Sequence, residues 1–100
     1  MLKSKRSRAC DIPKKVKDKV WERDHNRCII CGSFYAKPNA HYIPRSKGGL
    51  GIEENIVTLC ERCHYDYDHT TFRKEIGEHI EAYLKRKYPG WEKEKVLYKK

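Results

Sequence analysis

Residues 40–49 read AHYIPRSKGG and residues 60–64 read CERCH, and these two stretches decide the fold. The first is a short apolar run that a proline ends and a glycine-rich turn follows. The second comes directly after residues 55–59, whose β-branched side chains favour a strand. We therefore predict an antiparallel hairpin of strands 40–43 and 55–59, followed by a helix over 61–69.

Two CxxC pairs frame this hairpin in the sequence. Cys28 and Cys31 precede it, Cys60 and Cys63 follow it, and 28 residues separate the pairs. Two residues between cysteines let both sulfurs reach one tetrahedral ion, so we predict a structural Zn²⁺ bound by all four. The interval is longer than in compact zinc ribbons, and the hairpin with its turn fits within it. Cys10 has no CxxC partner and is expected to be a bystander thiol.

Three polar residues lie on the predicted strands and the helix that follows them. His41 ends the first apolar run, Asn55 follows 14 residues later, and His64 comes 9 residues after that, directly against Cys63. In combination with the CxxC pairs, this pattern resembles the HNH nucleases of the ββα-metal type over roughly residues 21 to 69. The resemblance implies a small α+β domain in which a hairpin and a helix carry the site, stapled by zinc and flanked by N- and C-terminal helices.

The resemblance also implies roles for these residues. His41 corresponds to the general base that deprotonates the attacking water, a task that suits a side chain titrating near neutral pH. Asn55 corresponds to the residue whose amide bonds the backbone across the hairpin loop and holds His41 in orientation. His64 corresponds to a ligand of the catalytic divalent ion.

One position departs from many members of that family. The residue before the base is often a metal ligand, whereas Ala40 has no donor atom. A single imidazole would hold Mg²⁺ or Mn²⁺ poorly, because these ions prefer oxygen ligands. Asp68 lies one helical turn after His64 and is the expected second ligand. His69 is the lesser candidate because its i+5 position faces away.

Basic residues are the candidates for DNA contact. Arg45 and Lys47 flank the base and are expected to contact or neutralise the scissile phosphate, Arg45 as part of the catalytic set; the alternative is that both are solvated loop charges. Lys14 and Lys15 lie on a helix expected to begin at an Asp11 N-cap, and that helix either only covers the core or also faces DNA. The three glycines of the turn allow close backbone approach to a ligand.

The rest of the chain supports a single small domain. We divide it into a disordered basic arm (1–10), a nuclease domain with its flanking helices (11–91) and a charged tail (92–100). A last helix is expected over about 72–88, stopped by Pro89-Gly90. His25 is expected at a helix end. Phe34 and Tyr35 are expected to pack under a loop over residues 33–39, and Trp91 to pack back on the domain.

The composition of the chain limits which classes of binding partner we expect. The formal net charge is +9, and residues 1–27 hold 10 Lys/Arg against 4 Asp/Glu. Such a basic chain is expected to bind nucleic acid. No apolar run approaches a membrane span, and an odd cysteine count without a secretory apolar segment favours a reducing, cytoplasmic compartment.

The function expected from this sequence is metal-dependent cleavage of DNA with weak sequence preference. Proteins resembling it are frequently encoded by phages, which implies the host cytoplasm as its location and packaging proteins as further partners. The rival interpretation is a non-catalytic zinc module that binds nucleic acid and retains a degenerate site without a ligand at position 40.

Overall fold

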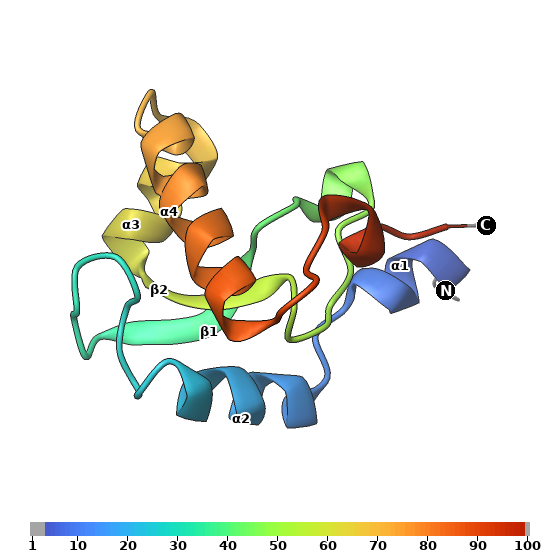
Figure 1. Cartoon of the computed structure of the whole chain (residues 1–100), viewed down its shortest axis with the longest axis horizontal. Coiled ribbons are helices and arrows are strands. Elements are labelled where there is room, and N and C mark those ends of the chain that lie inside the picture. Colours follow the sequence, from blue (N-terminus) through green and yellow to red (C-terminus); the bar gives the residue numbers. More distant parts are fainter. Residues whose placement is uncertain (1–3, 100) are drawn as a thin grey trace.

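A two-stranded antiparallel hairpin lies at the centre of the protein, as the computed structural model of residues 4–99 shows (Figure 1). Helix α2 covers one face of the hairpin, and α3 and α4 lie on the other. The α+β fold with a hairpin followed by a helix is therefore confirmed. The elements, in chain order, are α1 (Lys5–Cys10), α2 (Lys14–Arg23), β1 (Ala36–His41), η1 (Arg45–Lys47), β2 (Ile56–Cys60), α3 (Glu61–His69), α4 (Arg73–Lys87) and η2 (Lys93–Val96).

Strand β2 lies at the centre of the hydrophobic core. All five of its residues are buried, because helices cover both faces of the hairpin. Strand β1 begins four residues earlier than expected and breaks register between Lys37 and Ala40. Pro38 lies in this break and has no N–H to donate to a ladder, so the pairing resumes only at Ala40 with Val57.

The N-terminal arm differs from the expectation. Residues 5–10 form helix α1, whose N-cap Ser4 accepts a hydrogen bond from the Ser7 amide, and Cys10 at its end is 2% exposed. The Gly51 amide donates to the Ala9 carbonyl, so this helix is anchored on the hairpin loop. The predicted disorder is thus wrong for these residues, while residues 1–3 of the arm lie outside the described residues.

The second helix also starts later than expected. Asp11 ends α1 and does not cap α2, which begins at Lys14 after Pro13. At its other end, Arg23 and Asp24 tie α2 to the core. The Asp24 carboxylate accepts from the Thr58 amide (2.8 Å) and the Tyr83 hydroxyl (2.6 Å). Arg23 donates to the carbonyls of Glu53 and Ile56 at 2.7 Å each, so this buried pair joins α2, β2 and α4.

The C-terminal segment after α4 packs on the domain, whereas the aromatic residues of the loop between α2 and β1 do not. Trp91 is buried, as expected, and the tail continues onto the domain, where Val96 is buried and Leu97 pairs with Gly49. Phe34 and Tyr35 were expected to pack under their loop but are 70% and 93% exposed. Lys100 lies outside the described residues. Among residues 4–99, no helix is both long and apolar enough to cross a membrane.

Candidate functional site

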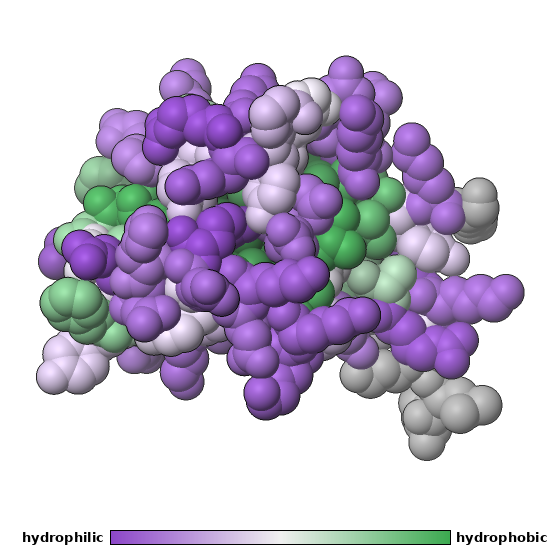
Figure 2. All heavy atoms as spheres, turned by 60° about the horizontal axis from the view of Figure 1, so that its bottom comes forward, coloured by the Kyte–Doolittle hydropathy of each residue, from purple (hydrophilic) through white to green (hydrophobic). Residues whose placement is uncertain are grey.

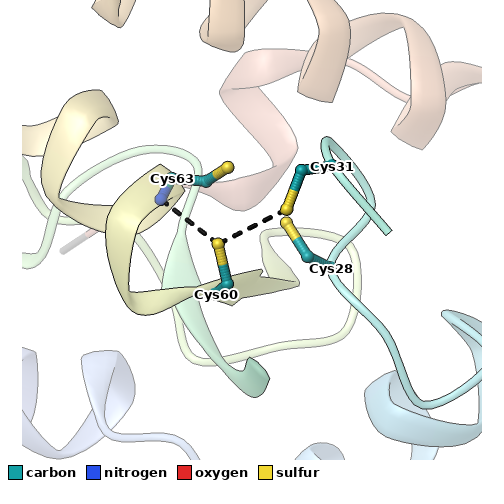
Figure 3. Close-up of side chains that lie close together, drawn as sticks. All are labelled: Cys28, Cys31, Cys60 and Cys63. Carbon is teal, nitrogen blue, oxygen red and sulfur yellow. Dashed lines mark hydrogen bonds between the residues drawn. The ribbon is translucent and has the colours of Figure 1, made fainter. Parts of the chain in front are cut away.

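Four cysteines converge from three separate segments. Figure 3 shows Cys28 and Cys31 on the loop after α2, Cys60 at the end of β2 and Cys63 on α3. Their sulfur atoms all lie within 4.8 Å of one another. Backbone amides point at them: Ile30 N–H donates to the Cys28 sulfur, and Cys63 N–H to the Cys60 sulfur, each at 3.4 Å. The predicted four-thiolate set is therefore assembled.

The donor chemistry of this cluster fits zinc. A tetrahedral ion with Zn–S bonds of about 2.3 Å would separate the sulfurs by about 3.8 Å, close to the 3.5 Å between Cys31 and Cys60. Burial first, and then the neighbouring sulfurs of Cys60 and Cys28, raise the pKa of the Cys63 thiol. Four thiolates at neutral pH would therefore need a cation to compensate their charge, and Zn²⁺ held by these four cysteines would supply it.

His41, the last residue of β1, is held by the backbone of α1. Its Nε2 lies 2.8 Å from the Cys10 carbonyl oxygen, which only accepts hydrogen bonds. The proton is therefore on Nε2, and Nδ1 keeps its lone pair. Burial lowers the pKa of His41, and the nearby positive charge of Arg45 lowers it further. The imidazole is consequently neutral near pH 7, with the lone pair of Nδ1 free to accept a proton.

Asn55 and a glycine fix the loop that follows His41. The Asn55 amide accepts from Ile43 N–H at 2.9 Å and donates to the carbonyls of Leu50 (2.9 Å) and Ile43 (3.2 Å). A Cβ on Gly49 would stand 1.6 Å from the Ile43 oxygen, so only glycine fits there. The close approach expected of the glycines is therefore made to the chain's own backbone.

A cavity of about 670 Å³ lies between His41, the loop that follows it and helix α3. His64 and Asp68 both face it, and His64 Nε2 lies 3.3 Å from Asp68 Oδ2. Their side chains are only 31% and 39% exposed, but the cavity leaves them open on one side. The residues lining it are Asn39, His41, Pro44, Arg45, Ser46, Lys47, His64, Asp68, His69 and Arg73.

Comparison with known proteins agrees with this arrangement. Residues 28–88 match the family model described as HNH endonuclease. The chain belongs to the HNH endonuclease family. It is also similar to Anaredoxin of Nostoc sp. (strain PCC 7120 / SAG 25.82 / UTEX 2576), with 34% identity over 55 residues, which are 54% of this chain and 72% of that protein.

In this HNH domain, position 40, directly before His41, cannot supply a metal ligand. Ala40 is 1% exposed and belongs to the hydrophobic core. It pairs with Val57, and the residues lining the cavity do not include it. Candidate ligands for a divalent ion therefore come from α3.

The basic residues predicted to contact DNA fall into two groups. Arg45 and Lys47 line the cavity, where Arg45 forms an ion pair with Asp11 at 2.8 Å. Lys14 and Lys15 are exposed on α2 and do not line it, and Lys14 pairs with Asp18. The structure therefore brings the loop cations to the HNH site and leaves the helix cations on its flank.

Sequence analysis missed three parts of the site. Arg73, at the start of α4, lines the cavity and donates to the Tyr67 carbonyl, yet nothing in its sequence context distinguishes it from other helix cations. The Cys10 carbonyl is a backbone group and leaves no side-chain signal. Asn39 lies two residues before His41 in β1, so strand alternation was a usable signal. His69, expected to face away, also lines the cavity.

Proposed function

We propose that this protein is a metal-dependent DNA endonuclease that hydrolyses phosphodiester bonds, nicking or cutting duplex DNA with little sequence specificity. The observation that carries the proposal is the placement of His41: its Nε2 is bound to the Cys10 carbonyl, and its ring lines the same cavity as His64 and Asp68. A general base and an ion-binding pair in one open cavity are what metal-assisted hydrolysis requires.

His41 is the general base in this proposal. With the proton on Nε2, Nδ1 accepts the proton of the attacking water, and the imidazolium that forms keeps its bond to the Cys10 carbonyl. The lowered pKa of His41 supports this role, because the neutral ring predominates at physiological pH.

His64 and Asp68 are the proposed ligands of Mg²⁺ or Mn²⁺. They lie at i and i+4 on α3, so one ion can contact both, and the carboxylate supplies the oxygen donor that these metals prefer. When bound, such an ion stabilises negative charge on the phosphate and on the leaving 3′-oxygen. Arg45, Lys47 and Arg73 line the same cavity and attract the phosphate.

Lys14 and Lys15 are proposed to contact the DNA backbone beside the cleavage site. They are exposed on α2, and the basic balance of residues 1–27 favours a polyanion along this part of the molecule. Contacts of this kind carry no base information, which is why the proposed cleavage has little sequence preference.

A non-catalytic DNA-binding module is the second candidate, because Ala40 offers no metal ligand and lies in the core. A supercoiled-plasmid assay with separate Mg²⁺, Mn²⁺, Zn²⁺ and EDTA reactions distinguishes the two. We expect nicking with Mg²⁺ or Mn²⁺ and none with EDTA. A module without catalysis would retard DNA in gels and leave every plasmid intact.

His41→Ala is the decisive variant in that assay. Loss of a positioned base should lower the nicking rate by about 10²–10⁴ while DNA still binds. His79→Ala is the matched control, because His79 is exposed on α4 and does not line the cavity. Parental nicking by His41→Ala would refute the proposal.

A further inference from the structure

A second cavity of about 670 Å³ adjoins the catalytic one. Asn39 and His64 line both, so the two form one continuous surface. Three aromatic side chains line the second cavity, Trp21, Phe34 and Tyr35, and Tyr35 is the most exposed of them at 93%. In Figure 2, hydrophobic side chains reach the surface at the left end of the molecule, where the loop between α2 and β1 lies in Figure 1.

This aromatic loop is held in place although its side chains are uncovered. The Cys28 amide donates to the Ser33 carbonyl at 2.9 Å, and the Tyr35 amide donates to the Ser33 hydroxyl oxygen at 3.1 Å. Cys31 anchors one end of the loop in the thiolate cluster, and β1 begins at Ala36 on the other. Arg27 lies over the Phe34 ring, 5.2 Å from its centroid, yet both aromatic side chains stay largely exposed. A fixed loop that exposes two large aromatic side chains is a candidate binding surface.

The charges around the two cavities differ and indicate which part of a nucleotide each would take. Arg45, Lys47 and Arg73 give the catalytic cavity three cations, which suit phosphate. The aromatic cavity has Lys37 but also Glu61, which would repel a phosphate. Aromatic rings beside one cation and one carboxylate suit a neutral, flat nucleobase better than backbone.

We propose that Trp21, Phe34 and Tyr35 form a stacking platform for an unpaired base of the DNA strand whose phosphate enters the catalytic cavity. This rests on the proposed nuclease function and narrows its substrate class. Bases in an intact duplex are stacked on one another and do not offer their faces, so the platform engages only unpaired nucleotides. The preferred substrate is therefore duplex DNA that carries a single-stranded segment next to the cleavage site.

Binding of DNA without cleavage tests the platform separately from catalysis. Zinc-loaded protein without added Mg²⁺ or Mn²⁺ is titrated with a single-stranded 12-mer, the blunt duplex of the same sequence, and that duplex with an unpaired extension. Tryptophan fluorescence reports stacking, because Trp21 lines the cavity while Trp91 is buried and bonded to the Glu54 carbonyl. We expect quenching by the two DNAs with unpaired bases, and its loss in Trp21→Phe.

Tyr35→Ala is the test variant, with Tyr65→Ala as its matched control. Tyr65 is also a strongly exposed tyrosine but lies on α3 outside this cavity. Removing one stacking ring should weaken binding of the single strand about tenfold and leave blunt duplex unchanged, while the control changes neither. Equal losses on both DNAs, no loss on either, or a parent protein that binds both equally would overturn the platform.

Two further outcomes keep the proposals apart. If plasmid nicking fails but the single-strand preference and its loss in Tyr35→Ala persist, the platform stands and the nuclease proposal falls. If nicking proceeds equally on blunt and extended DNA, in the parent and in Tyr35→Ala, the nuclease stands and the platform falls. A change from dimer to monomer in Tyr35→Ala, measured by sedimentation, would assign the rings to self-association and refute base stacking.

Discussion

The four-cysteine cluster and the cavity lined by His41, His64 and Asp68 are neighbours with opposite arrangements of polar groups. Cys63 belongs to the first and His64 to the second, so one peptide bond on α3 separates them. The cluster closes four equivalent sulfur ligands around one point, whereas the cavity offers an imidazole and a carboxylate and leaves the other positions open. A closed ligand set is typical of structural metal sites and an open one of catalytic metal sites, and α3 contributes residues to both sets here.

Breaking the cluster should have the largest effect. Cys60→Ser removes a sulfur ligand and also the acceptor for the Cys63 amide, so we expect loss of cooperative folding. Structural zinc contributes on the order of 10 kcal/mol to small modules, and Cys10→Ser, at a buried thiol outside the cluster, should cost only about 1–3 kcal/mol. Zinc content and thermal unfolding measure both; a folded Cys60→Ser protein with under half the zinc would contradict this.

Removing the proposed divalent-ion ligands His64 and Asp68 should leave the fold intact. We expect His64→Ala to abolish Mn²⁺ binding in the cavity, and Asp68→Ala to weaken it about 10-fold or more, without change in zinc content. Asp66→Ala is the control, since Asp66 is on the same helix but does not line the cavity. Calorimetric Mn²⁺ titration of zinc-loaded protein measures this, and parental affinity in Asp68→Ala would show that the ligand assignment is wrong.

Moving the Cys10 carbonyl that holds His41 should lower turnover without changing metal binding. A Cβ at position 51 would stand 1.8 Å from the Asp11 oxygen and 3.0 Å from the Cys10 oxygen that holds His41. Gly51→Ala should therefore lower kcat about 10²-fold, as misplacement by an ångström can, with unchanged Mn²⁺ affinity. Gly90→Ala is the control for general backbone strain: its φ of +83° disfavours any side chain, but its Cβ would meet nothing within 4 Å and leaves the Cys10 carbonyl in place. Unchanged turnover in Gly51→Ala would show that the carbonyl is dispensable.

The smallest effect is expected from pH. A general base must be neutral, and burial lowers the pKa of His41 below its ordinary 6.5, so the acid limb of kcat/KM should lie below pH 6.5. Arg45 also lowers this pKa, so Arg45→Gln should move the limb upward. Rates measured between about pH 5 and 8 check both directions. A limb above 6.5, or one that moves downward in the variant, would contradict the assigned environment.

Local patterns made the centre of the molecule predictable. The spacing of the CxxC pairs led to the four-cysteine cluster, and the β-branched run before Cys60 led to β2. Helix α3 has the predicted bounds because it starts at the second CxxC pair, where Cys60 is its N-cap. In each case neighbouring residues carry the information, so the sequence suffices.

The periphery depends on distant contacts and was not predictable in the same way. Helix α1 has six residues and no apolar stripe, and it is held by contacts such as the bond from Gly51 to Ala9, which lie far apart in sequence. Phe34 and Tyr35 were expected inside because they are aromatic, but composition does not say which way a loop side chain points. The roles of the site residues remain predictions for the experiments above.

Both ends of the described chain meet at the loop after His41. Arg6 donates to the Ser46 carbonyl, the Tyr98 amide donates to the Gly48 carbonyl, and a Cβ on Gly48 would lie 3.6–3.8 Å from both side chains. Figure 1 shows the two ends side by side at this edge of the molecule. Tension applied through the two ends would load these contacts before the buried hairpin and the four-cysteine cluster. We therefore expect single-molecule pulling to detach the loop that lines the cavity at a lower force than the one that unfolds the core.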